Sequence, residues 1–129
     1  MELDFYDNVN NDYPDDCIFC LKNFTKDELI ILSMEIDKII KNNVKINLSE
    51  LHYINNISKN ELMLKLGTVD KGIIKVKDNQ YECVLTKVQY LEMKEMLLHY
   101  EITNIGTHYY WLCDTISEID FLLSYDGNW

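Results

Sequence analysis

Residues 61–99 read ELMLKLGTVDKGIIKVKDNQYECVLTKVQYLEMKEMLLH, and this stretch contains both hydrophobic periods of the chain. Between Glu61 and Leu85, large apolar side chains recur at every second position, which is typical of half-buried strands. Gly67, Asp70–Gly72 and Asp78–Asn79 interrupt this alternation with residues that favour turns. We therefore predict an antiparallel meander of three short strands, followed by a helix.

The helical period begins at Thr86. Thr86 and Gln89 have the spacing of a capping box, which predicts a helix from Thr86 to His99. The expected apolar face of this helix consists of Val88, Leu91, Met96, Leu97 and Leu98. Thr25 and Glu28 have the same capping spacing and predict a second helix, from Thr25 to Lys41, whose apolar face comprises Leu29, Leu32, Ile36, Ile39 and Ile40.

The two ends of the chain complete the predicted fold. Thr107–Cys113 and Ile119–Ser124 have strand-like composition or alternation, whereas residues 1–16 carry six carboxylates, no lysine and several turn-forming residues. We predict an acidic irregular arm over residues 1–16 within a single globular domain, residues 1–129. Strands in local groups with helices between them indicate an α+β fold, with a mostly antiparallel sheet of four to six strands packed by two main helices.

The charge of the chain limits its partners. Acidic residues outnumber basic ones 22 to 12, every basic residue is lysine, and the net charge is −10. Nucleic acid and anionic membrane would repel such a surface, whereas basic proteins would be attracted to it. No apolar run approaches the roughly 18 residues of a membrane span. No signal-peptide pattern opens the chain either, so we expect a cytoplasmic protein.

Four cysteines raise the question of a metal or redox site. Cys17 and Cys20 form the one C-x-x-C motif, while Cys83 and Cys113 lie in separate predicted strands and are expected to be isolated from each other. Zinc usually needs four ligands, and a second close pair is missing. Reduced structural thiols without metal are therefore our expectation, and a mixed zinc site with His52 or His108, or a redox role for Cys17 and Cys20, stays open as an alternative.

The sequence lacks the common motifs of catalytic sites. The chain has no Gly-x-Ser-x-Gly, no glycine-rich phosphate loop and no His-Glu-x-x-His. Paired carboxylates such as Asp15–Asp16 are expected to be solvated surface groups in a chain of this charge. We therefore expect a protein that is not an enzyme and needs no cofactor.

The C-terminal third interleaves aromatic and acidic residues, a combination that is enriched at protein recognition sites. Trp111 and Phe121 are expected in the core, because about half of the rings in a strand must point inward. Tyr109, Tyr125 and Trp129 are expected at the surface. The predicted partner-binding residues are Asp114, Glu118, Asp120, Tyr125, Asp126 and Trp129.

The closing residues 121–129, FLLSYDGNW, resemble the strand ending in Asp-Gly-Asn-Trp or Asp-Gly-Asp-Trp of colicin and cloacin immunity proteins. As a small, acidic, motif-poor α+β protein, the chain also resembles immunity proteins of polymorphic toxin systems, including contact-dependent growth inhibition. The resemblance implies tight binding to a cognate toxin domain, often a basic nuclease. Two alternatives remain: a zinc or redox domain using Cys17 and Cys20, and an acidic nucleic-acid mimic that inhibits another enzyme.

Overall fold

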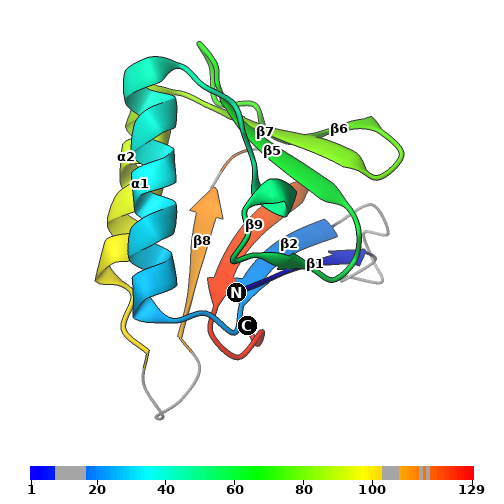
Figure 1. Ribbon diagram of the computed structural model, residues 1–129. Helices are drawn as coiled ribbons and strands as arrows, with labels where there is room; N and C mark the ends of the chain where they lie inside the picture. The colour runs from blue at the N-terminus through cyan, green and yellow to red at the C-terminus, as the bar shows by residue number, and fades with distance from the viewer. Residues whose placement is uncertain (8–16, 103–107, 114, 116) are drawn as a thin grey trace.

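A computed structural model describes residues 1–7, 17–102, 108–113, 115 and 117–129. These residues form an α+β fold with two α-helices and nine strands (Figure 1). The α+β class and the two main helices are confirmed. The strands, however, form two sheets, and each sheet contains parallel as well as antiparallel neighbours.

The five-stranded sheet has the order β4-β1-β2-β9-β8. Its strands are β1 (Glu2–Asp7), β2 (Cys17–Lys22), β4 (Asn55–Asn56), β8 (Tyr109–Cys113) and β9 (Ile119–Ser124). Two antiparallel pairs, β1–β2 and β8–β9, are joined by parallel pairing of β2 with β9. The sheet is mixed because its N-terminal and C-terminal halves meet in its middle.

Strand β1 corrects the prediction of an irregular arm. Leu3 and Phe5 face the main core, while the alternate residues Glu2, Asp4 and Tyr6 face the other way, so β1 has the two-residue period of a strand. The carboxylates on its polar face hid this alternation in the sequence. Residues 8–16, the remainder of the predicted arm, lie outside the described residues.

The four-stranded sheet has the order β3-β5-β7-β6. Its strands are β3 (Ile46–Asn47), β5 (Glu61–Leu66), β6 (Gly72–Lys77) and β7 (Gln80–Leu85). The predicted meander is wrong here, because β7 lies between β5 and β6 and runs parallel to β5. The connection after β5 follows β7, where Gly67 N–H donates to Leu85 O at 2.9 Å and Lys71 N–H to Val84 O at 3.0 Å.

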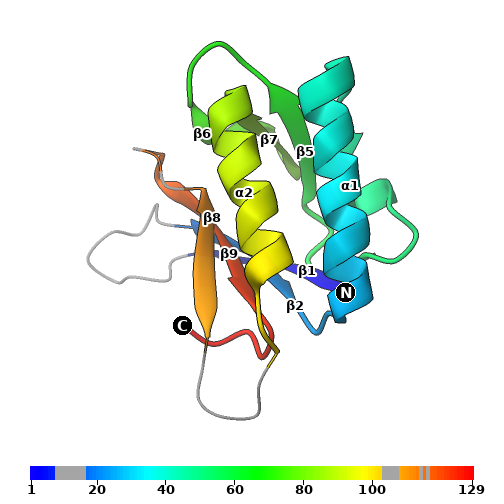
Figure 2. The same ribbon diagram turned by 90° about the vertical axis from the view of Figure 1, so that its left-hand side faces the viewer.

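Helix α1 (Lys26–Asn42) begins with the complete Thr25–Glu28 capping box. Helix α2 (Lys87–His99) begins at Thr86, whose side chain accepts from Gln89 N–H. The two helices run antiparallel (Figure 2), and Lys94 of α2 lies 2.8 Å from the Asp37 carboxylate of α1. Together they cover one side of both sheets. A short 3-10 helix, η1 (Leu48–Glu50), precedes β4.

The buried face of α2 differs from the predicted one. Tyr90, Met93 and Leu97 are buried, whereas Val88 and Leu91 are 63% and 47% exposed. The Tyr90 hydroxyl lies 2.8 Å from the Lys65 carbonyl oxygen and 2.9 Å from that of Cys83, so it ties the helix to β5 and β7. A tyrosine with a polar partner thus takes the position expected for aliphatic residues.

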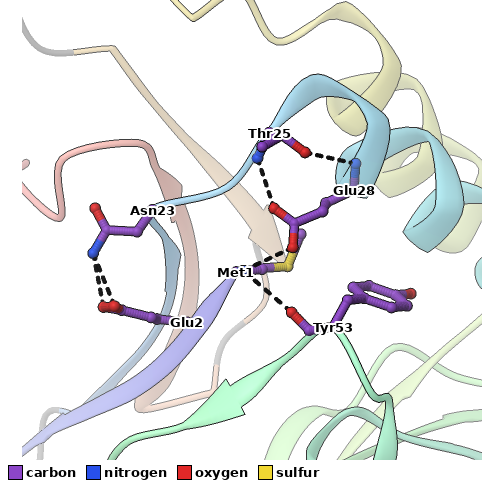
Figure 3. A network of polar contacts seen from close by, with 6 residues as sticks. All are labelled: Met1, Glu2, Asn23, Thr25, Glu28 and Tyr53. Carbon is purple, nitrogen blue, oxygen red and sulfur yellow. Dashed lines mark hydrogen bonds and ion pairs between the residues drawn. The ribbon is translucent and has the colours of Figure 1, made fainter.

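The start of the chain is fixed between α1 and the segment that precedes β4 (Figure 3). The Met1 amino group donates to Glu28 Oε2 at 2.8 Å and to the Tyr53 carbonyl oxygen at 3.1 Å. Glu28 Oε1 also accepts from Thr25 N–H at 2.8 Å. Burial raises the pKa of Glu28, but these donors outweigh burial and hold the pKa below its usual value.

Within the described residues, no helix is long and apolar enough to cross a membrane.

Candidate functional site

The five-stranded sheet has two chemically different faces. Phe19, Leu21, Phe121 and Leu123 belong to the main core beneath the helices. The alternate residues Ile18, Cys20 and Leu122 form a second buried cluster, on which Tyr6 packs. We call the side of this second cluster the outer face, and it comprises Asp4, Tyr6, Ile18, Cys20, Lys22, Tyr109, Trp111, Asp120, Leu122 and Trp129.

Strand β9 is therefore buried on both faces. The alternation of Ile119, Phe121 and Leu123 predicted a half-buried strand, yet Leu122 and Ser124 are also fully buried. The sequence of a central strand with a parallel neighbour is typically a continuous apolar run when both faces of the sheet are covered. This burial gives the outer face a rigid floor.

The C-terminal tail folds across the outer face. The Trp129 ring lies 5.4 Å from the Tyr6 ring of β1, centroid to centroid, and Trp129 is still 48% exposed. Gly127 has a φ of +76°, and a Cβ at this position would lie 3.0 Å from Lys22 Cδ, so the tail approaches the sheet closely. Figure 2 shows the C-terminal end on the side of β8 away from the helices.

A turn at Asp126 directs the tail. Asn128 N–H donates to Asp126 Oδ1 at 3.0 Å, and this bond, with further contacts from Asn128 and Ser124, lowers the pKa of the carboxyl below its usual value. The Ser124 hydroxyl lies 2.6 Å from the Asn128 carbonyl oxygen. The turn at Asp126–Asn128 therefore has a definite role, because it directs the tail back across the sheet so that Trp129 reaches Tyr6 of β1.

The one lysine of the outer face is engaged by its neighbours. Lys22 Nζ lies 2.9 Å from the Tyr6 hydroxyl and 3.1 Å from Asp4 Oδ2, and it sits over the Tyr6 ring at 5.5 Å. The hydrogen bond to Tyr6 is the largest cause that raises the pKa of Lys22. The lysine cation is thus held by Tyr6 and Asp4. The rest of the surface of this face is acidic and aromatic.

Strand β8 supplies the second aromatic pair. Tyr109 and Trp111 stand opposite Ser124 and Leu122 of β9, which places both side chains on the outer face. Their rings meet edge to face at 5.8 Å. The prediction of Trp111 as a core residue is wrong: its side chain is 37% exposed, because its register assigns it to the face opposite the helices.

The six predicted binding residues are distributed over several places. Asp120 pairs with Ile18 and Trp129 packs on Tyr6, so both belong to the outer face. Tyr125 is exposed as expected but lies on the inner side, where its ring contacts Phe24 at 5.7 Å. Three further positions are Asp126 in the tail turn, Glu118 in the exposed turn before β9, and Asp114, which lies outside the described residues.

Sequence reasoning missed Tyr6 and Trp111 as members of this face. Tyr6 belongs to the predicted irregular arm. The apolar residues Leu3 and Phe5, two positions apart, indicate a strand that would place Tyr6 on the opposite face. Trp111 and Tyr109 are two positions apart, which in a strand places them on one face, but the sequence does not reveal which face is covered. Phe121, by contrast, is in the core as predicted.

Charge is unevenly distributed along the chain. The last 35 residues, from Glu95 onward, contain six carboxylates and no lysine. Lysines are instead concentrated around the four-stranded sheet, at Lys65, Lys71, Lys75 and Lys77. Glu118, Asp120 and Asp126 therefore flank the β8–β9 pair without a lysine from the same segment. The C-terminal segment therefore adds only negative charge beside the β8–β9 pair.

The cysteines do not form a chelating group within the described residues, where no three His, Cys, Asp or Glu side chains cluster around a metal position. Cys17 and Cys20 are three positions apart in β2, so their side chains point to opposite faces. Burial raises the pKa of Cys20 to about 12. Cys83 and Cys113 were expected to be isolated, but their thiols, one from each sheet, lie close enough to interact, and this contact and burial raise the pKa of Cys83.

A shallow cavity of about 560 Å³ lies at the C-terminal end of α2. It is lined by Lys26, Leu98, His99, Tyr100, Glu101 and Ile102. The Lys26 ammonium donates to the carbonyl oxygens of Leu98 and Tyr100, so it caps the helix and is not available to a ligand. The arrangement has no nucleophile paired with a base among these residues.

No known protein family, curated protein or solved structure matches the chain. Function therefore has to be inferred from surface chemistry. The outer face offers the most distinctive chemistry: exposed aromatic rings from β8 and the C-terminal tail lie beside the doubly buried strand β9, with carboxylates around them.

Proposed function

We propose that this protein is a non-catalytic immunity protein, which binds and neutralises a cognate bacterial toxin domain through its outer face. We take the toxin to be a basic nuclease and the compartment to be the cytoplasm. The observation that supports the proposal most strongly is the exposure of Tyr109, Trp111 and Trp129 on one sheet face, all three within the C-terminal 35 residues, which contain no lysine.

Such a face suits a nuclease as partner. A nuclease attracts the phosphates of its substrate with basic side chains, and the same side chains would attract Asp120 and the neighbouring carboxylates. Rim charges accelerate the encounter, whereas buried aromatic side chains account for most of the binding energy. The rings of the outer face already contact one another, so little conformational entropy would be lost on binding.

The competing functions have less support. A Cys17–Cys20 metal or redox site would need both sulfurs on one side of β2, and the strand directs them to opposite sides. A nucleic-acid mimic would share the acidic surface but needs no exposed tryptophans. The resemblance of residues 121–129 to colicin-type immunity proteins also favours a toxin as the partner.

Co-expression with the toxin domain of an effector encoded beside this protein tests the proposal. We expect wild-type protein to restore growth and to co-purify with the toxin. Trp111→Ala should weaken both effects, and Val76→Ala, an exposed apolar residue of β6, should weaken neither. Growth arrest that persists with wild-type protein, or equal protection by the Trp111→Ala variant, would contradict the proposal.

A further inference from the structure

The four sheet edges of the described residues differ in how well they are protected against pairing with another strand. Strands β3 and β4 are two residues long, too short to template a new strand. Strand β6 has Lys75 and Lys77 and a bulge between them. In addition, the Ser117 hydroxyl donates to the Ile73 carbonyl oxygen of β6 at 2.6 Å.

Strand β8 shares the register shift, which falls between Trp111 and Cys113, but it is longer than β3 and β4 and has no lysine. Its five residues, Tyr109–Cys113, include no charged residue and no proline. It forms the end of its sheet, pairing with β9 on one side. Because every second backbone N–H and C=O of an edge strand points away from its neighbour, β8 offers a row of hydrogen-bonding groups to an incoming strand.

Side chains on both faces of β8 favour an extended ligand. Tyr109 and Trp111 project from the outer face, and Tyr110 projects from the inner face, where its ring meets Tyr100 at 5.4 Å. All three β8 aromatics are partly exposed. A strand added beside β8 would place its alternate side chains against the outer-face rings and against the inner-face ring. Backbone hydrogen bonds of an added strand supply affinity, and such side-chain contacts supply specificity.

We propose that β8 accepts an extended, lysine- or arginine-rich segment of the partner as an additional strand of the five-stranded sheet. This inference rests on the proposed function and specifies its binding mode. Charge identifies the occupant: Asp126 lies two residues beyond Ser124, which is opposite Tyr109, and Glu118 and Asp120 lie near the other end of the ladder. A second copy of this chain would bring like charges together along the same edge, which opposes self-pairing.

A peptide probe separates backbone pairing from charge attraction. The probe is an alternating Lys–Val peptide of about ten residues, long enough to cover a strand of typical length. The matched control has the same sequence with every backbone nitrogen methylated, so it keeps the charges and side chains but has no N–H donor. Amide hydrogen exchange of the full-length protein is followed in β8 and, as an internal reference, in β6.

We expect the unmodified peptide to slow exchange of the β8 amides that face away from β9, with no change in β6. The methylated peptide should bind roughly tenfold more weakly or worse, because it cannot form the intermolecular ladder. Trp111→Lys should abolish the protection, whereas Val76→Lys in β6 should retain it. Equal binding of the two peptides, or absence of β8 protection, would overturn the inference, as would β8 protection that grows with protein concentration alone.

The same exchange measurement on the toxin complex keeps the two proposals distinguishable. If outer-face variants weaken the complex but β8 amides stay unprotected in it, strand addition fails and the immunity function stands. If no toxin complex forms and the peptide still protects β8, the immunity function fails and the strand-accepting edge stands.

Discussion

Strands β8 and β6 occupy the same place in their sheets, yet their surfaces differ in chemistry. Both are edge strands with exposed apolar residues, such as Trp111 in β8 and Val76 in β6. Both strands have a register shift, but lysines accompany the apolar residues of β6, whereas further aromatic rings and nearby carboxylates accompany those of β8. The difference indicates that one edge is protected against association and the other is built for it.

The largest effect is expected beneath the outer face. Leu122→Ala should lower the free energy of unfolding by about 2–5 kcal/mol, because Leu122 is fully buried in one cluster with Ile18 and Cys20. Val76→Ala should change it by less than about 0.5 kcal/mol. Urea denaturation of both variants measures this difference. Similar values for the two would mean that the outer face lacks the rigid floor described above.

The next largest effect concerns binding. Trp111→Ala should weaken the toxin complex by about 2 kcal/mol, roughly thirtyfold in Kd, because a central tryptophan is the typical anchor of an interface. Isothermal titration with Val76→Ala as the control determines the change. A Trp111→Ala variant with wild-type affinity would remove β8 from the binding surface, and the contrast with β6 would lose its functional meaning.

Trp129→Ala should have a smaller effect on stability. The ring contact with Tyr6 is worth about 1 kcal/mol for an aromatic pair, and the exposed remainder of the side chain contributes little. In a protein that already carries Trp129→Ala, Tyr6→Ala should then cost less stability than it costs in the wild type. A double-mutant cycle followed by thermal denaturation measures this difference. Additive losses would show that the tail is not held by this pair.

The smallest effect is the acid sensitivity of the Met1–Glu28 contact. Because the folded-state pKa of Glu28 lies below its usual value of 4.5, its stabilising contribution is present above that value and is lost as the pH falls through the lowered pKa. Since this ion pair is partly solvated, the contribution should be below about 1 kcal/mol. Glu28→Gln should flatten the decline of Tm below about pH 4.5 relative to the exposed control Glu50→Gln. An unchanged acid profile would contradict this assignment.

Features fixed by neighbouring residues were predictable from the sequence. The capping boxes at Thr25 and Thr86 predicted both helix starts, and the alternation after Glu61 predicted β5. These signals depend on contacts within three or four residues. The closing turn at Asp126–Asn128 belongs to the same class, since its hydrogen bonds are local.

Features that depend on distant pairing were not predictable. The sequence does not encode locally that β2 lies parallel to β9, or that β7 separates β5 from β6. Trp111 is the clearest case, because its alternation indicated one face of a strand but not which face the helices would cover. The sequence therefore predicted that aromatic and acidic residues gather at the candidate site, and it named Asp120 and Trp129 among them. Only the fold shows that Tyr6 and Trp111 lie on the same face.

The acidic outer face should steer a basic partner toward the protein. The most direct test is the association rate constant of the toxin complex as ionic strength rises from about 0.01 to 0.15 M. It is measured for wild type, Asp120→Lys and Asp78→Lys, where Asp78 is an exposed acid beside β6 and provides the same charge change at the other edge.

We predict that the wild-type rate falls steeply with salt. Asp120→Lys should lower the low-salt rate by several-fold and flatten the dependence, while Asp78→Lys should remain close to wild type. A salt-independent rate, or equal losses in the two variants, would contradict the account.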